Sequence, residues 1–238
     1  MDEVRPELGR NLTYGLLDSI GCAIVTGRYD HQAFPTEAEL AKLHGVSRSV
    51  TREAVKMLTA KGLLSARPRQ GTVVKPPSSW NLFDTDVLRW LLERQFSVEQ
   101  LKYFNQLRVA IEPEAAALAA RFAGPDDLSQ IDRGLERMEA AERGFDDELE
   151  ADIAFHVAVL RASGNPFYAQ LRDVVMTALS TSIRFTNRIK GRPANVADHA
   201  AVRDAIAAHD ADAARSAMRS IIADVLDLIE THGAAFGA

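Results

Sequence analysis

Two residues in the second half of the chain have the types and the spacing of metal ligands. Asp152 and His156 both interrupt the apolar stripe of a segment, 146–163, that has the periodicity of a helix. Residues four positions apart lie on one face of a helix, one turn from each other. His199, in a later segment, shares its predicted face with apolar residues and would also point inward. The three side chains predict either a site for a divalent metal such as Zn, Ni or Mn, or a set of hydrogen-bonded core residues.

A fourth polar residue, Arg108, interrupts a similar apolar stripe in the segment 97–122. A buried guanidinium without a partner is costly, so this side chain needs an anion. The anion could be an acidic residue of the same chain, for example Glu112 or Glu150. It could also be the carboxylate or phosphate of a ligand that both arms of the guanidinium hold. The pattern alone leaves both interpretations open.

Basic residues concentrate in a different part of the chain, between Lys42 and Lys75, where eight lysines and arginines accompany a single acid. Arg48, Arg52 and Lys56 recur every four residues and would line one helical face. Arginine can donate to O6 and N7 of guanine together, and the short hydroxyl groups nearby suit phosphates and base edges. This face predicts contact with DNA, and a merely solvated basic helix is the alternative.

The elements around this face have the order of a winged helix-turn-helix. Thr36 can cap a first short helix with Glu39 as its capping-box partner, and Ser47 can cap the basic helix that follows. Two short β-like pieces, 63–65 and 72–74, then enclose a basic tip. The arrangement predicts a fold that places its second helix in the major groove of DNA.

The remainder of the chain predicts a helical bundle. Breaks at glycine and proline delimit helices near 97–122, 125–143, 146–163, 166–189, 194–208 and 210–232. Short loops between long amphipathic helices favour an antiparallel arrangement. The expected fold class is therefore mainly α, with a winged helix-turn-helix domain at 1–76, a linker at 77–84 and an all-α domain at 85–238.

Charge is divided unequally between the two parts. Residues 1–76 carry 11 basic and 8 acidic side chains, a net charge of +3, whereas the remainder carries 17 and 25, a net charge of −8. This asymmetry is typical of a basic DNA-binding domain joined to an acidic second domain. The single cysteine, Cys22, excludes an intrachain disulfide. No signal peptide and no apolar run of membrane-spanning length is visible, so we expect a cytoplasmic protein without membrane contact.

The run from residue 34 to 64 reads FPTEAELAKLHGVSRSVTREAVKMLTAKGLL, with RQGTVV in the wing. It resembles the DNA-binding domain of the GntR superfamily of bacterial transcription regulators. Ala38 stands where many members place a DNA-contacting arginine, which leaves the operator sequence open. The resemblance implies DNA contacts at Thr36, Ser47, Arg48, Ser49, Arg52, Arg69, Gln70 and Gly71.

The second domain resembles the effector-binding helical domain of the FadR subfamily, through LRVAIEPEAAALAA, ADIAFHVAVLRASGNP, DHAAVRDAI and ARSAMRS. In that subfamily an aspartate and three histidines bind a divalent metal, and a carboxylate effector sits on the metal. The resemblance implies Asp152, His156 and His199 as ligands and Arg108 as the arginine of the pocket. The position of the fourth ligand falls on Ile221, which cannot ligate, so we expect three protein ligands.

The segment WNLFDTDVLRWL, residues 80–91, resembles the junction in sugar-acid-responsive regulators such as D-galactonate operon repressors. We therefore expect a homodimeric repressor that leaves a palindromic operator when an aldonate such as galactonate or gluconate binds. Asn195 and Phe185 are predicted as further effector contacts.

Two alternatives remain beside this expectation. One is the same regulator with a lactate-like carboxylate effector. The other is an all-α metallohydrolase fused to a DNA-binding module. The sequence contains no H-E-x-x-H motif and no evident general base, and both observations argue against this alternative. The protein is therefore expected not to be an enzyme.

Overall fold

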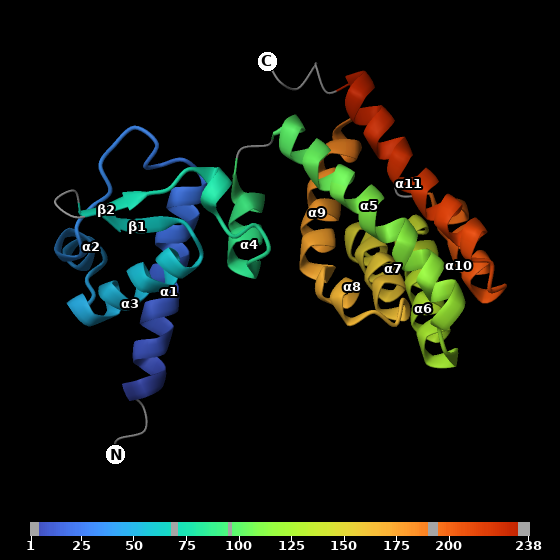
Figure 1. Ribbon diagram of the computed structural model, residues 1–238, viewed down its shortest axis with the longest axis horizontal. Helices are drawn as coiled ribbons and strands as arrows, with labels where there is room; N and C mark the ends of the chain where they lie inside the picture. Colours follow the sequence, from blue (N-terminus) through green and yellow to red (C-terminus); the bar gives the residue numbers. More distant parts are fainter. Residues whose placement is uncertain (1–4, 68–70, 95–96, 190–194, 233–238) are drawn as a thin grey trace. The chain divides into compact units, whose positions relative to one another are not determined.

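Helices dominate the computed structural model, which describes residues 5–67, 71–94, 97–189 and 195–232 (Figure 1). The chain divides into two units, Met1–Gln95 and Phe96–Ala238. Within the described residues the sheet structure is a single two-stranded ribbon in the first unit. The mainly α fold class, with an N-terminal winged helix-turn-helix and a C-terminal helical domain, is confirmed. Among the described helices, none combines the length and the apolar character needed to cross a membrane.

The first unit begins with three helices. They are α1 (Arg5–Val25), α2 (Glu37–His44) and α3 (Arg48–Ala60). Thr36 and Glu39 form the predicted capping box at the start of α2, and Gly45 ends that helix in the left-handed conformation with a φ of 64°. Ser47 caps α3, because its side chain accepts a hydrogen bond from the backbone of Val50. The local sequence therefore sets the tight turn between α2 and α3.

The wing follows α3 directly. Strands β1 (Leu64–Arg67) and β2 (Gly71–Val74) pair antiparallel, with Leu64 opposite Val74 and Arg67 opposite Gly71. Gly71 has a φ of 78°, a conformation that glycine adopts without strain. The two short strands predicted from the sequence are confirmed: β1 begins one residue later and ends two residues later than expected, and β2 begins one residue earlier.

The short helix α4 (Thr85–Glu93) packs on the first unit. The Trp90 ring lies directly on Gly21 of α1, and its indole nitrogen donates to Asp18 at 2.7 Å. Val87 and Trp90 of α4 are buried in one apolar cluster with residues of α1, whereas the sequence predicts that residues 85–93 belong to the second domain. The short connection between the units comes after α4 instead of before it.

The second unit contains the remaining helices. They are α5 (Val98–Phe122), α6 (Pro125–Glu142), α7 (Glu148–Ala162), α8 (Pro166–Gln170), α9 (Arg172–Ile189), α10 (Val196–Ala207) and α11 (Ala211–His232). Their ends match the glycine and proline breaks of the sequence closely. The predicted helix at 166–189 is the exception, since it is interrupted at Leu171 and forms α8 and α9.

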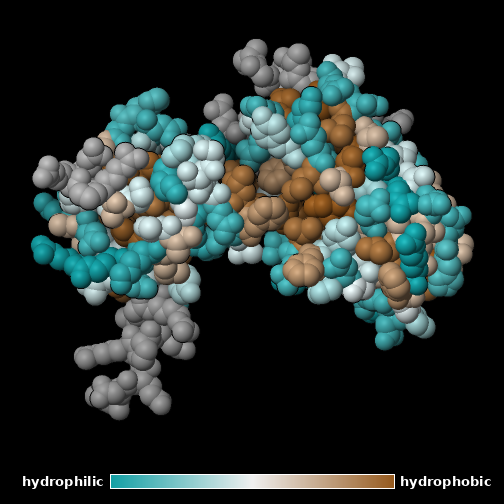
Figure 2. All heavy atoms as spheres, in the orientation of Figure 1, coloured by the Kyte–Doolittle hydropathy of each residue, from teal (hydrophilic) through white to brown (hydrophobic). Residues whose placement is uncertain are grey.

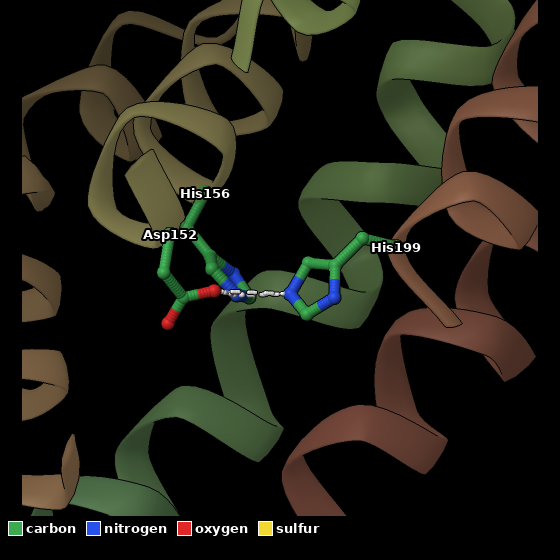
Figure 3. Close-up of side chains that lie close together, drawn as sticks. All are labelled: Asp152, His156 and His199. Atoms are coloured by element: carbon green, nitrogen blue, oxygen red, sulfur yellow. Dashed lines mark hydrogen bonds and ion pairs between the residues drawn. The ribbon is translucent and has the colours of Figure 1, made fainter. Parts of the chain in front are cut away.

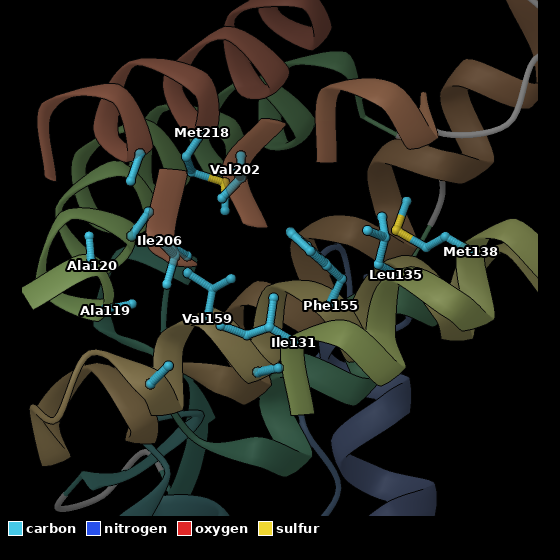
Figure 4. Packing of buried hydrophobic residues seen from close by; sticks show 14 of the residues in the cluster. Ala119, Ala120, Ile131, Leu135, Met138, Phe155, Val159, Val202, Ile206 and Met218 are labelled. Atoms are coloured by element: carbon cyan, nitrogen blue, oxygen red, sulfur yellow. The ribbon is translucent and has the colours of Figure 1, made fainter. Parts of the chain in front are cut away.

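The core of this unit lies between α5, α6, α7, α10 and α11 (Figure 4). Phe155 of α7 is fully buried at its centre, and Gly134 of α6 lets the two helices approach closely. A Cβ atom at position 134 would lie 2.8 Å from the Cα of Phe155. The Phe155 ring also meets the His199 ring edge to face, with the ring centroids 5.1 Å apart. The packed core thus fixes the helices that carry the candidate metal ligands.

Candidate nucleic-acid interface and metal centre

The exposed face of α3 carries the DNA-contacting residues that the sequence predicts. Ser47, Arg48, Ser49 and Arg52 are all exposed at the start or along the outer side of the helix. The opposite side of α3 is buried. The guanidinium of Arg52 lies 3.4 Å from the carboxylate of Glu37 on α2, a contact between an exposed and a half-buried side chain. Such a contact is weak, so it leaves Arg52 able to bind a phosphate or a base.

Two residues near this face have other roles. Thr51 carries one of the short hydroxyl groups near the basic face, but it is fully buried and its hydroxyl donates to the carbonyl of Ser47. Lys61, counted among the basic residues, donates to Asp84 at 2.8 Å and pairs with Asp86 at the start of α4. The DNA-facing charge is thus smaller than the sequence count indicates.

The hydroxyl of Thr36 is exposed but is occupied by the capping box with Glu39. Gly71 opens the second strand of the wing and is exposed. Arg69 and Gln70 lie outside the described residues. The contacts predicted for the wing tip remain predictions.

Asp152, His156 and His199 converge in the interior of the second unit (Figure 3). The first two come from adjacent turns of α7, and His199 comes from α10. One ligand atom from each residue lies within 4.8 Å of the others, and all three residues are buried. The nitrogens Nε2 of the two histidines are 3.3 Å apart, and Nε2 of His199 is 3.1 Å from Oδ1 of Asp152. The three predicted ligands therefore lie together in one buried cluster, and metal binding there stays a prediction.

The hydrogen bonds of the histidine rings show that this cluster fits a cation. Nδ1 of His199 lies 2.8 Å from the carbonyl oxygen of Asn195, which can only accept, so Nδ1 donates this bond and Nε2 is left to face Asp152. Oδ1 of Asp152 is buried and has no hydrogen bond of good geometry among the described residues, although Nε2 of His199 lies 3.1 Å from it. A carboxylate oxygen and a ring nitrogen that face each other in this way are complementary to a metal ion, which would replace a proton between them.

His156 is oriented in the same way by a second carboxylate. Its Nδ1 lies 2.5 Å from Oε2 of Glu112 on α5. Burial opposes a charge on this ring, but Glu112 and Asp152 outweigh burial and raise the pKa of His156 to about 9. Burial likewise acts to raise the pKa of Asp152, and the two histidines reverse that effect and hold it well below its ordinary value. Because Glu112 faces Nδ1, the proton on Nε2 is the one that a metal would replace.

Arg108 lies beside the cluster and has an internal partner. Its guanidinium donates to both carboxylate oxygens of Glu112, and its exposed fraction is only 2%. Burial acts to raise the pKa of Glu112, but Arg108 and His156 overcome it and lower that pKa to about 2. Of the two acidic residues weighed from the sequence, Glu112 is the one that pairs with Arg108. Nη2 of Arg108 is also 3.5 Å from Nε2 of His156, so the arginine borders the metal-ligand atoms.

The structure also adds two residues that the sequence pattern did not single out. Asn105 on α5 and Ser182 on α9 are buried and bonded to each other, and Asn105 accepts a hydrogen bond from Arg108. The available signal was the spacing of Asn105 and Arg108, which are three residues apart on one helical face.

The two further effector contacts predicted from the sequence have different outcomes. The side chain of Asn195 is exposed and caps α10, while its backbone carbonyl oxygen accepts a hydrogen bond from Nδ1 of His199. Phe185 belongs to α9, and its side chain lies outside the described part of that helix. Ile221 is a partly buried residue packed against the apolar core and supplies no ligand atom.

Comparison with known proteins matches both units to one kind of regulator. Residues 16–74 match the family of bacterial regulatory proteins named gntR, and residues 104–224 match the FCD domain. The chain is 35% identical over 219 residues to the uncharacterised helix-turn-helix transcriptional regulator YieP of Escherichia coli K12, covering 90% of this chain and 93% of that protein. It is also 35% identical over 218 residues to the galactonate operon transcriptional repressor of the same organism, covering 90% and 94%.

Among solved structures, Escherichia coli McbR/YncC has the same fold, with a TM-score of 0.52 and 19% identity over 93% of this chain and 98% of that one. The relatives are transcription regulators, so the metallohydrolase alternative does not apply. With a DNA-binding helix-turn-helix, a wing and a helical domain that matches FCD, the chain belongs to the gntR family of bacterial regulators, in the FadR-like subfamily.

Proposed function

We propose that this regulator is a repressor that a small sugar acid, such as galactonate or gluconate, releases from its operator. The observation that carries the proposal is the convergence of Asp152, His156 and His199 beside Arg108 in the buried interior. Burying such a group of charged and ligating side chains inside a helical bundle costs free energy, and binding a small anionic ligand would explain why the group is there. The galactonate operon repressor matches nearly the whole length of this chain, and its name supports a sugar acid as the effector.

The charges of the site explain why the effector would be an anion. Asp152 and Glu112 supply two negative charges, and Arg108 supplies one positive charge. A divalent ion such as Zn, Ni or Mn, held by Asp152, His156 and His199, would act as a Lewis acid toward a carboxylate and would leave the site with one excess positive charge. A monoanionic carboxylate would neutralise that excess, whereas a neutral sugar would not.

Arg108 would bind the effector by exchanging partners. Its guanidinium is now held by Glu112, and a ligand carboxylate beside His156 would compete for the same donors. The exchange would shift Arg108 on α5 and with it the packing of α5 against α7. A tenfold loss of operator affinity requires the effector to prefer the released state by about 1.4 kcal/mol.

On the DNA side, we propose that the cytoplasmic protein binds a palindromic operator as a homodimer, with α3 of each copy in the major groove. Paired recognition helices read half-sites about one DNA turn apart, roughly 34 Å. The second unit would form the dimer, because apolar side chains gather on its visible face (Figure 2). Its exposed large apolar residues within the described part are Tyr103, Phe122, Phe145, Phe167 and Met176.

Thermal-shift measurements test the effector and the metal together. The melting temperature of the full-length protein should rise with Zn²⁺ or Ni²⁺, and should rise further with galactonate or gluconate. A chelator should remove both increments, and His199→Ala should do the same, whereas His44→Ala in the other unit should not. A stabilisation by the sugar acid that is unchanged by chelator would contradict the metal-dependent site. A response to lactate instead of the aldonates would favour the lactate-like alternative.

A further inference from the structure

Buried polar side chains continue from the metal-ligand cluster along α5 toward α9. Glu112, Arg108 and Asn105 follow one another on the inward face of α5, at intervals of four and three residues. Arg108 donates from Nη1 to Oδ1 of Asn105 at 3.3 Å. Nδ2 of Asn105 donates to Oγ of Ser182 at 3.0 Å. The polar interior therefore extends past the arginine and ends at a neutral amide and a neutral hydroxyl.

Asn105 and Ser182 are not needed to balance charge. The guanidinium of Arg108 is already neutralised by Glu112. The exposed fractions of Asn105 and Ser182 are 0% and 3%, so each has lost its hydration on folding. Apolar residues of similar volume would fill these positions without that desolvation cost. The pair therefore calls for a role beyond stability.

The bonds between the two side chains suit an exchange with a ligand. The Ser182 hydroxyl accepts from Nδ2 of Asn105 and also lies within donating distance, 3.4 Å, of its Oδ1. Nδ2 of Asn105 also donates to the carbonyl oxygen of Leu101 at 2.9 Å, and that bond could stay in place while a ligand replaces the bond to Ser182. A ligand hydroxyl, which both donates and accepts, can replace either partner and preserve the number of hydrogen bonds.

We propose that Asn105 and Ser182 bind hydroxyl groups of the effector and so select a polyhydroxylated acid over a short acid with few hydroxyls. The inference rests on the proposed function, because it takes the effector carboxylate to lie between Arg108 and the metal-ligand cluster. With the carboxylate there, the following carbon atoms of the effector come within reach of Asn105, the neighbour of Arg108. A site built to bond a hydroxyl discriminates strongly against an analogue that lacks it, because buried polar groups would be left unpaired.

Isothermal titration calorimetry of the full-length protein loaded with Zn²⁺ tests this assignment, with D-galactonate and L-lactate as the probes. Ser182→Ala and Asn105→Ala should each weaken D-galactonate binding by about tenfold, the equivalent of one good hydrogen bond, and should change L-lactate binding by less than about twofold. Ser182→Thr keeps the hydroxyl and should restore most of the D-galactonate affinity. The matched control is Thr177→Ala on the same helix, where a buried hydroxyl donates to the carbonyl of Asp173 instead.

The outcomes separate this inference from the proposed function. If the wild-type protein binds D-galactonate and the two alanine variants bind it equally well, Asn105 and Ser182 do not read hydroxyls and the inference alone fails. A similar loss for both acids, or a loss that Ser182→Thr does not repair, would show a structural role and would overturn the inference as well. If the Zn²⁺-loaded wild-type protein binds neither acid, the proposed function fails and the inference fails with it.

Discussion

Oε2 of Glu112 lies 2.5 Å from Nδ1 of His156, while the other ring nitrogen of this histidine faces Asp152. The two residues come from different helices, α5 and α7. A carboxylate on one ring nitrogen fixes the tautomer and the orientation of the ring, so that the other nitrogen is presented to a metal. Glu112 therefore orients His156 and at the same time neutralises Arg108.

Glu112→Gln is expected to weaken Zn²⁺ binding by about 10- to 100-fold, the usual effect of losing a carboxylate behind a ligating histidine. A competition titration against a metal-binding indicator measures the affinity. The control is Glu114→Gln on the same helix, where the side chain is partly exposed and pairs with Arg215. Equal Zn²⁺ affinity in the wild-type protein and the Glu112→Gln variant would show that His156 needs no such support.

Arg48→Ala and Arg52→Ala are expected to weaken operator binding, because both side chains project from the exposed face of α3. Replacing a residue that contacts a phosphate should reduce the slope of log affinity against log salt by about 1. Replacing a residue that contacts a base should weaken the binding free energy by about 1–3 kcal/mol and relax the sequence preference. Fluorescence anisotropy on a DNA fragment selected for binding, at several salt concentrations, gives both quantities. Arg172→Ala in the second unit is the control, and unchanged binding by both α3 variants at moderate salt would refute the assignment of the recognition helix.

Gly21→Ala is expected to destabilise the first unit by about 1–3 kcal/mol, the usual cost of overpacking. The added methyl group would overlap the buried Trp90 ring. Gly15→Ala on the same helix is the matched control, since nothing lies within 4 Å of a Cβ there. The control should be neutral or slightly stabilising through helix propensity. Chemical denaturation followed by circular dichroism and Trp fluorescence measures both variants, and a neutral Gly21→Ala would mean that α4 does not pack on α1 as observed.

The pairing of Lys61 with Asp86 is expected to make the first unit sensitive to acid. Burial acts to raise the pKa of Asp86, but bonds from Lys61 and Arg89 dominate and lower it below its ordinary value of 3.8. A carboxyl whose pKa is lowered by folding stabilises the protein above its unfolded pKa, and this contribution disappears as the pH falls through the folded value. Asp86→Asn should therefore cost about 1 kcal/mol at neutral pH.

The difference between the Asp86→Asn variant and the wild-type protein should shrink as the pH falls below 3.8. Urea unfolding at a series of pH values measures it. A difference that stays constant into the acid range would show that the ion pair is not its source.

The sequence by itself determined the elements and the chemistry that short range controls. Capping residues such as Thr36 and Ser47 and breaks such as Gly45 fixed where helices begin and end, because these effects act within a few residues. The four-residue spacing of Asp152 and His156 placed both on one helical face, and the inward stripe of His199 brought it to the same interior. Periodicity is sufficient there, since the helical repeat dictates the direction of each side chain.

Only the tertiary structure decided which partners meet across helices. Glu112 was one of two acidic residues that could pair with Arg108, and its second contact, with His156 on α7, depends on how α5 and α7 pack. The pairing of Asn105 with Ser182 joins residues 77 positions apart and has no local signature. The sequence likewise left open what the apolar face of α4 packs against. The structure shows that Trp90 packs on Gly21 of α1. Contacts of this kind follow from shape and burial over the whole fold, which no local pattern contains.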